Sequence, residues 1–215
     1  MSQPAPSYVP SYVHGGAASA ELLGETIGSN LARTVARFPD RPALIVPGRA
    51  VRWSYAELAR RAEDFAAGLL ALGLEPGDRI GIWSPNNPEW VIAQFATAMA
   101  GLILVNINPA YRLAELEYAL NKVECRALIT ATAFKTSDYV GMLNALAPEL
   151  AAAAPGALAA ARLPSLRLPI QIGGPAAPGF LPFARVADTA DSASRARLAE
   201  IGARLQFDDP INIQF

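Results

Sequence analysis

The chain has 215 residues, of which 52% are hydrophobic and 17% are charged, a composition typical of globular proteins and not of disordered or fibrous ones. Its 18 Lys and Arg residues and 19 Asp and Glu residues leave a net charge of -1, so no strong positive field would attract nucleic acid or an anionic membrane. A single cysteine, Cys125, and a single histidine, His14, exclude a disulfide framework, a cysteine-rich zinc site and most histidine-based catalysis.

The sequence also contains no run of about 20 uninterrupted apolar residues, which a membrane-spanning helix needs. Its longest apolar stretch, residues 90–105, is interrupted by Gln94, Thr97 and Gly101. The first basic residue is Arg33, so the patterns of a secretory signal and of an Arg-rich transit peptide are absent. We therefore expect no transmembrane segment and a cytoplasmic location.

The first elements lie between residues 1 and 53. Residues 1–24 are rich in Pro, Ser, Tyr and Ala without periodicity, which is typical of an N-terminal arm. A helix is predicted over 26–38, where apolar residues recur at helical spacing up to Pro39. Two short apolar runs, 43–46 and 51–53, flank a Pro-Gly turn and predict a hairpin.

A long amphipathic helix is predicted directly after this hairpin, ending at Gly73. Ser54 and Glu57 stand at the spacing of a capping box, in which each side chain bonds a backbone N–H group that the first turn leaves unpaired. The apolar stripe of the helix consists of Leu58, Ala62, Phe65, Leu69 and Leu72.

From residue 79 onward, short β-rich runs alternate with helical segments, which indicates parallel strands joined by helical crossovers. The expected strands are 79–83, 102–107 and 127–130, and the expected helices are 88–100, 113–123 and 137–147. Asn87 and Pro88 are the expected N-cap and first residue of one helix. The strands lack polar alternation because helices cover both faces of such a sheet. We therefore expect an α/β fold with an incomplete doubly wound, mostly parallel sheet and flanking helices.

The last part of the chain, residues 151–215, is interpreted as a loop-rich connection around one strand at 168–172. A short helix at 192–201 and a strand at 211–215 follow. The expected organisation is an arm (1–24), an α/β subdomain (25–150) and a connection that begins the next subdomain (151–215). Because a β-α architecture would send a turn and a helix after the last strand, we expect the chain to be truncated.

No phosphate-binding loop can be identified in the sequence. Neither GxGxxG nor GxxxxGK[ST] occurs, and the two lysines, Lys122 and Lys135, have no glycine-rich segment before them. The pair Gly173-Gly174 precedes Pro175, which lacks an N–H donor, so a turn is favoured over an anion site.

Other chemically capable residues are assigned structural roles. Cys125 has no histidine near it in sequence, so a buried, inert thiol is favoured over a nucleophile. His14 lies in the arm and is interpreted as a solvated or turn residue. Asp208 and Asp209 point to opposite sides of an extended chain, which favours a turn over a shared acid/base site.

Two loops follow strand ends, where open α/β sheets often bind ligands. Trp83 and Trp90 flank the first loop, 84–87, and the second loop spans 108–112. Large aromatic residues at such spacing usually pack in a core, so packing is favoured over ligand binding.

Several segments resemble, in order, motifs of the adenylate-forming superfamily, which includes acyl-CoA synthetases, peptide-synthetase adenylation domains and luciferases. The matching segments are 53–58 (WSYAEL), 77–83 (GDRIGIW), 85–86, 89–90, 100–111 and 115–118. Three further segments, 12–15, 155–158 and 209–215, are similar to the medium-chain acyl-CoA ligase type called acyl-CoA synthetase family member 2.

This resemblance implies the N-terminal part of the large domain of an adenylate-forming enzyme. The implied reaction joins a fatty acid to CoA: the carboxylate attacks ATP to give an acyl-adenylate and pyrophosphate, and the CoA thiol then displaces AMP. ATP and Mg²⁺ are the implied cofactors of the full-length enzyme, together with CoA. In the family, the phosphate loop, the Glu for the metal, the Asp for the ribose and the Lys of a small C-terminal domain come later than the segment that resembles 211–215.

No catalytic, cofactor-binding or metal-binding residue is therefore carried over to this chain, and we expect it to be inactive alone. The alternatives are a non-catalytic α/β module for binding or subunit interaction, and a small autonomous enzyme with a site that the motifs do not reveal. Truncation would expose a sheet edge and apolar helix faces, so a homodimer or other self-association is expected. No nucleic-acid partner is expected.

Overall fold

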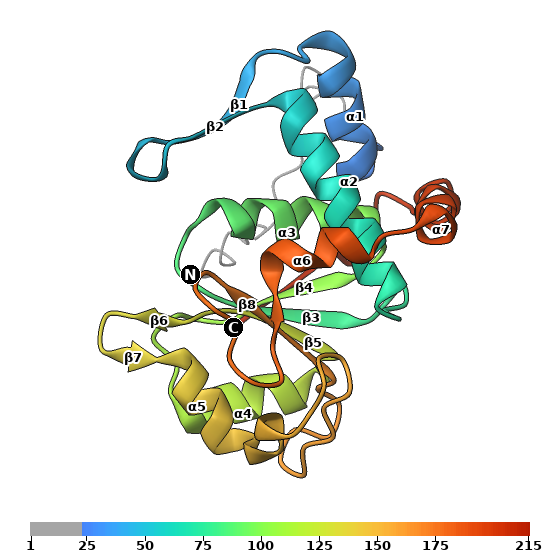
Figure 1. Ribbon diagram of the computed structural model, residues 1–215. Coiled ribbons are helices and arrows are strands. Elements are labelled where there is room, and N and C mark those ends of the chain that lie inside the picture. The colour runs from blue at the N-terminus through green and yellow to red at the C-terminus, as the bar shows by residue number, and fades with distance from the viewer. Residues whose placement is uncertain (1–22) are drawn as a thin grey trace, which may run out of the picture.

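A six-stranded sheet forms the centre of the computed structural model, which describes residues 23–215 (Figure 1). Its strands are β3 (Arg79–Trp83), β4 (Ile103–Asn106), β5 (Ala127–Ala131), β8 (Leu168–Ile172), β9 (Leu181–Pro182) and β10 (Asn212–Gln214). The spatial order is β10-β4-β3-β5-β8-β9, and every neighbouring pair is parallel. The predicted α/β fold with a parallel sheet is confirmed.

Helices cover both faces of this sheet (Figure 1). One face carries α2 (Tyr55–Ala71), α3 (Pro88–Met99) and α6 (Phe183–Val186), and the other carries α4 (Leu113–Lys122) and α5 (Tyr139–Leu146). Alternate strand residues enter two separate cores, so that Ile80 and Ile82 of β3 join the first core and Trp83 joins the second. This double covering explains why the strands lack polar alternation.

The remaining elements lie around these layers. They are α1 (Ile27–Arg37), the antiparallel hairpin of β1 (Pro42–Val46) and β2 (Val51–Ser54), the hairpin of β6 (Ala133–Phe134) and β7 (Ser137–Asp138), α7 (Ser192–Gly202), and the 3-10 turns η1 (Pro47–Arg49), η2 (Pro148–Ala151) and η3 (Ala187–Thr189). Among the described residues, no helix combines the length and the apolar character needed to cross a membrane. The predicted arm lies outside the described residues apart from its last two.

Of the two helix starts predicted from cap residues, one is confirmed and the other is half-confirmed. Asn87 Oδ1 accepts a hydrogen bond of 2.8 Å from Trp90 N at the start of α3, and Pro88 is the first helical residue. Ser54 Oγ accepts from Glu57 N at 3.2 Å, but the reciprocal half of the capping box is wrong. The Glu57 carboxylate instead accepts from Arg61 Nη2 at 2.6 Å, in an ion pair in which both partners are charged.

The strands β8, β9 and β10 all belong to the same sheet as β3, β4 and β5. Residues on both sides of position 150 therefore build one sheet, and the division into subdomains stays a prediction. The pair β6-β7 and the segment of β9 and α6 are elements that periodicity does not predict, because each is only two to four residues long.

Candidate functional site

A pocket of about 330 Å³ opens where β3, β4 and β10 end, and it is called the carboxyl-edge pocket here. Its lining consists of Ile82, Ser84, Asn86, Trp90, Asn106, Ile107, Asn108, Pro109, Gln214 and Phe215. Open α/β sheets bind their ligands outside the carboxyl ends of the strands, so this pocket is the candidate functional site. The structure brings together here the two loops that the sequence analysis marked at strand ends.

The polar side chains of this pocket are uncharged. They are one hydroxyl and four carboxamides, from Ser84, Asn86, Asn106, Asn108 and Gln214. Carboxamides donate and accept hydrogen bonds but do not exchange protons near neutral pH, so this lining can recognise a ligand without acting as an acid or a base. Asn106 Oδ1 is buried and has no hydrogen-bond partner among the described residues, which leaves one acceptor available.

The two loops of the pocket are held in place by their own side chains. Asn87 Nδ2 donates to Ser84 Oγ at 2.6 Å, and Ser84 Oγ donates to the carbonyl oxygen of Pro85 at 2.9 Å. In the second loop, Asn108 Oδ1 accepts from the backbone N–H of Ala110 at 2.9 Å. Such local bonds replace the missing backbone partners of a loop and fix its conformation.

Trp83 and Trp90 have different roles. Trp83 is fully buried and stacks on Tyr139, with ring centroids 3.8 Å apart and 19° between the planes, so its predicted packing role is confirmed. Tyr139 Oη donates to the carbonyl oxygen of Pro109 at 2.6 Å, and burial raises the pKa of Tyr139 to about 12. Trp90 packs against the first core and also lines the carboxyl-edge pocket.

The other singled-out residues lie outside this pocket. Cys125 is buried in the second core, and burial raises the pKa of its thiol to about 12, as expected for an inert cysteine. Asp209 Oδ2 accepts from Gln206 N at 2.8 Å, which confirms the turn at 208–209. Gly173 and Gly174 have positive φ angles of 75° and 64°, as a turn requires. His14 lies outside the described residues.

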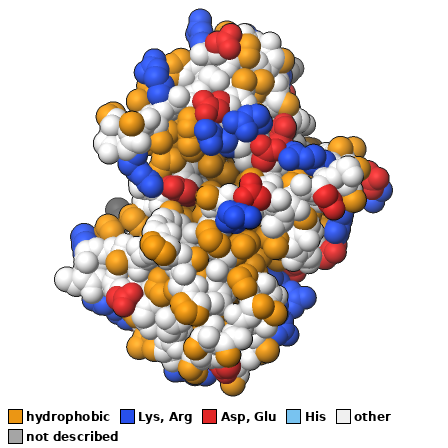
Figure 2. Space-filling view, in the orientation of Figure 1, with side chains coloured by type: hydrophobic (Ala, Val, Ile, Leu, Met, Phe, Trp, Pro, Cys, Tyr) orange, Lys and Arg blue, Asp and Glu red, His pale blue; other side chains and the backbone are white. Residues whose placement is uncertain are grey.

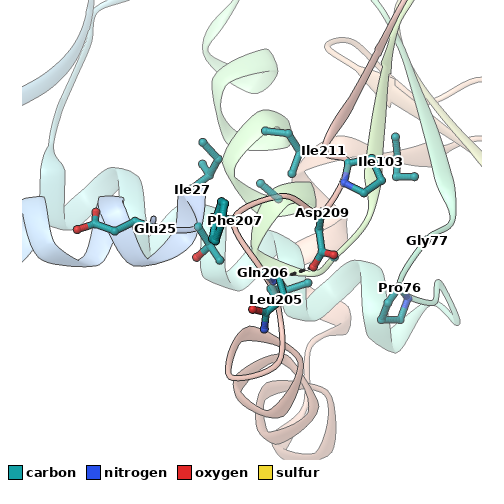
Figure 3. A pocket seen from close by; sticks show the side chains of 14 residues that line it. Glu25, Ile27, Pro76, Gly77, Ile103, Leu205, Gln206, Phe207, Asp209 and Ile211 are labelled. Carbon is teal, nitrogen blue, oxygen red and sulfur yellow. Dashed lines mark hydrogen bonds between the residues drawn. The ribbon is translucent and has the colours of Figure 1, made fainter. Parts of the chain in front are cut away.

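A second cavity, of about 290 Å³, lies at the opposite, amino edge of the sheet (Figure 3). Figure 3 shows Ile103 and Ile211 at the starts of β4 and β10, with Phe207 and Ile27 nearby. Glu25 and Asp209 are the charged residues of its lining, and both are already bonded, to Arg33 and to the Gln206 backbone. Because the amino edge is not the ligand-binding edge of an open α/β sheet, this cavity is not the candidate site.

A third cavity, of about 380 Å³, lies between β2, α2, α3 and α6. Figure 2 shows apolar side chains gathered between charged ones on this face of the molecule. Each of its three guanidinium groups has a carboxylate partner: Arg49 with Glu89 at 2.8 Å, Arg60 with Asp64 at 3.3 Å, and Arg61 with Glu57 at 2.6 Å. These ion pairs satisfy the charges of the cavity, so it offers no free cation to an anionic ligand.

Two observations bear on how residues 23–215 would fit a magnesium–triphosphate group. No cluster of three or more His, Cys, Asp or Glu side chains exists among residues 23–215 that could hold a metal ion. The carboxyl-edge pocket likewise has no carboxylate and no basic side chain in its lining. The expectation that the chain supplies no catalytic, cofactor-binding or metal-binding residue stays a prediction.

The chain is similar to known ligases over most of its length. It is 44% identical over 210 residues to the mitochondrial medium-chain acyl-CoA ligase ACSF2 of Danio rerio, which covers 98% of this chain and 34% of the relative. The Homo sapiens ligase of the same name is 44% identical over 208 residues, with coverages of 95% and 33%. The acetoacetyl-CoA synthetase of Streptomyces lividans matches the structure with a TM-score of 0.63 and 26% identity, over 78% of this chain and 25% of that one.

These relatives correct one expectation. The zebrafish and human ligases are mitochondrial by name, which contradicts the expected cytoplasmic location. That expectation depended on the absence of basic residues before Arg33, and a targeting segment is a separate stretch that the folded domain does not need.

The chain spans about a third of the length of the curated relatives that it matches. A family model described as AMP-binding enzyme matches residues 31–215, which include all six strands of the sheet. The resemblance stated from the motifs is confirmed, and the chain belongs to the AMP-binding enzyme family.

Proposed function

We propose that this chain is the N-terminal part of a fatty-acyl-CoA ligase that uses ATP and Mg²⁺, and that it is inactive by itself. Its role is to supply the parallel-sheet scaffold and one wall of the active site, the carboxyl-edge pocket. The substrates of the whole enzyme are a fatty acid and CoA, which places the protein in fatty-acid metabolism. Activation of a carboxylate requires charge stabilisation of the polyphosphate, and the rest of the enzyme supplies it.

One observation carries this proposal: the candidate pocket lies at the ligand-binding edge of the sheet, yet its polar side chains are all uncharged. Such a wall can orient a substrate through hydrogen bonds. It cannot transfer a proton or neutralise a triphosphate. The similarity to ligases about three times as long supports the division of labour between this wall and residues elsewhere in the enzyme.

A chimera tests the proposal. Residues 1–215 are joined to the part of the zebrafish ligase that follows its matching segment, and acyl-CoA formation from octanoate, ATP and CoA is measured. We expect the chimera to turn over and residues 1–215 alone to give no product above background. The matched control carries Gly202→Ala, which lies outside the pocket lining with open space around an added Cβ, and should turn over like the unmodified chimera.

Two results would contradict the proposal. Turnover by residues 1–215 alone would show that this chain carries a complete site. A chimera that folds, as judged by circular dichroism and a cooperative melt, but forms no acyl-CoA would show that the scaffold does not belong to a ligase of this kind.

A further inference from the structure

Two side chains join α3 to β10 by a reciprocal pair of hydrogen bonds. Gln94 Nε2 donates to Asn212 Oδ1 at 3.2 Å, and Asn212 Nδ2 donates to Gln94 Oε1 at 3.4 Å. Asn212 Nδ2 also lies 3.3 Å from the carbonyl oxygen of Leu104, on the neighbouring strand β4. Asn212 therefore ties the edge strand to a helix above the sheet and to the strand beside it.

The Gln94–Asn212 pair lies close to the carboxyl-edge pocket along both α3 and β10. On α3, Trp90 precedes Gln94 by four residues, which is about 6 Å along a helix axis. On β10, Gln214 follows Asn212 by two residues, which is about 6.6 Å along a strand and returns to the same face of the sheet. Both Trp90 and Gln214 line the pocket.

The helix α3 and the strand β10 run in opposite directions, so Trp90 and Gln214 both lie on the carboxyl-edge side of the Gln94–Asn212 pair. The helix α3 leaves the carboxyl edge after the loop 84–87, whereas β10 runs toward that edge. A contact between Gln94 and Asn212 thus brings Trp90 opposite Gln214. On the opposite face of β10, Ile213 packs against the second core. An apolar contact has no preferred direction, whereas a pair of hydrogen-bonded amides fixes the register of the strand.

We propose that Gln94 is a positioning residue of the carboxyl-edge pocket: through Asn212 it fixes the register of β10 against α3 and places Gln214 opposite Trp90. The inference deepens the proposed function, because this pocket is the wall that the ligase would use. Among the described residues, β10 is a three-residue strand at the edge of the sheet, and the Gln94–Asn212 pair adds to the few backbone bonds that hold it.

The test is carried out on residues 1–215 by NMR, with no substrate present. Three reporters are followed: the amide of Leu104, which donates to Ile211 O at 2.9 Å, the amide of Phe215, which donates to Asn106 O at 3.1 Å, and the indole N–H resonance of Trp90. In Gln94→Leu, we expect hydrogen exchange of both amides to accelerate about tenfold and the Trp90 indole resonance to shift.

A compensating exchange separates positioning from general stability. Gln94→Asn and Asn212→Gln should each accelerate exchange, because one amide no longer reaches the other, and the double variant should restore both amide protection and the Trp90 resonance. Met99→Leu is the matched control, since it changes the end of the same helix, outside the lining of the carboxyl-edge pocket, and should leave all three reporters unchanged.

The proposal is overturned if Gln94→Leu leaves the reporters unchanged, or if the double variant is no better than the worse single variant. Should Gln94→Leu fail to fold, the two conservative variants and their combination still decide the matter. None of these readouts depends on ligase activity, so failure here is distinguishable from failure of the proposed function.

Discussion

At the scale of single residues, burial separates reactive groups from inert ones in this chain. Cys125 is only 1% exposed, and burial raises the pKa of its thiol to about 12. The nearby Arg79 guanidinium opposes this shift, but desolvation is the larger cause. Because the thiolate is the reactive form, the folded protein should protect this cysteine over the whole physiological pH range.

We expect Cys125 to react with iodoacetamide at least about 100-fold more slowly in the folded protein than in guanidinium chloride at pH 8. In the folded protein the rate should rise with pH up to about pH 11, since the thiolate fraction grows about tenfold per unit below the pKa. The measurement is mass spectrometry of timed aliquots. Labelling of the folded protein at the rate of a free cysteine would show that the thiol is accessible.

At the scale of elements, glycine is required where the backbones of two segments approach each other closely. Gly68, in the middle of α2, lies against the carbonyl group of Val186, and a Cβ there would overlap with that oxygen. Thr189 Oγ1 also donates to Gly68 O at 3.1 Å, which fastens the turn after α6 to this point of the helix. The stacked pair of Phe65 and Phe183, 4.3 Å between centroids, completes the contact.

Gly68→Ala should therefore lower the free energy of unfolding by about 1–3 kcal/mol, although alanine is the better helix former. Gly202→Ala is the matched control, because Gly202 ends α7 with no atom within 4 Å of an added Cβ. The control should be neutral or slightly stabilising. Urea denaturation with equal m values measures both changes, and an unaltered midpoint for Gly68→Ala would contradict the close approach.

The contact at Gly68 also shows where sequence patterns stop being informative. The periodicity of α2 predicts its buried stripe, and Asn87 with Pro88 predicts the start of α3, because these signals are local. Neither β9 nor α6 has such a signal, since their position depends on packing against Phe65 and Gly68. The carboxamides of the candidate pocket are likewise brought together by the fold and not by spacing.

At the scale of the whole molecule, the order of the strands depends on contacts between distant segments. The sequence predicts each strand of the sheet except β9, yet β10 pairs with β4 across a separation of about a hundred residues, as in Asn212 with Leu104. Alternation of helices and strands predicts parallel pairing but not which strands become neighbours. The result places β10 at one edge of the sheet, where its outer side has no partner strand among the described residues.

Self-association through this edge is the expected consequence. Ile211 and Phe215 bond to β4 through their backbone, so Asn212 and Gln214 direct their backbone groups outward. Gln214→Pro removes one outward N–H donor without touching the bonds to β4, and should reduce association in sedimentation velocity. Gln214→Ala keeps the donor and should associate like the wild type, and a monodisperse wild-type monomer would contradict the expectation.

We predict that residues 1–215 do not bind Mg·ATP, and binding alone tests this prediction. Isothermal titration of Mg·ATP into purified residues 1–215 should give no saturable heat at ligand concentrations up to about 1 mM. The full-length zebrafish ligase serves as the positive control for the titration. Saturable binding at one site per chain, with a Kd below about 1 mM, would contradict our interpretation of this chain as a scaffold.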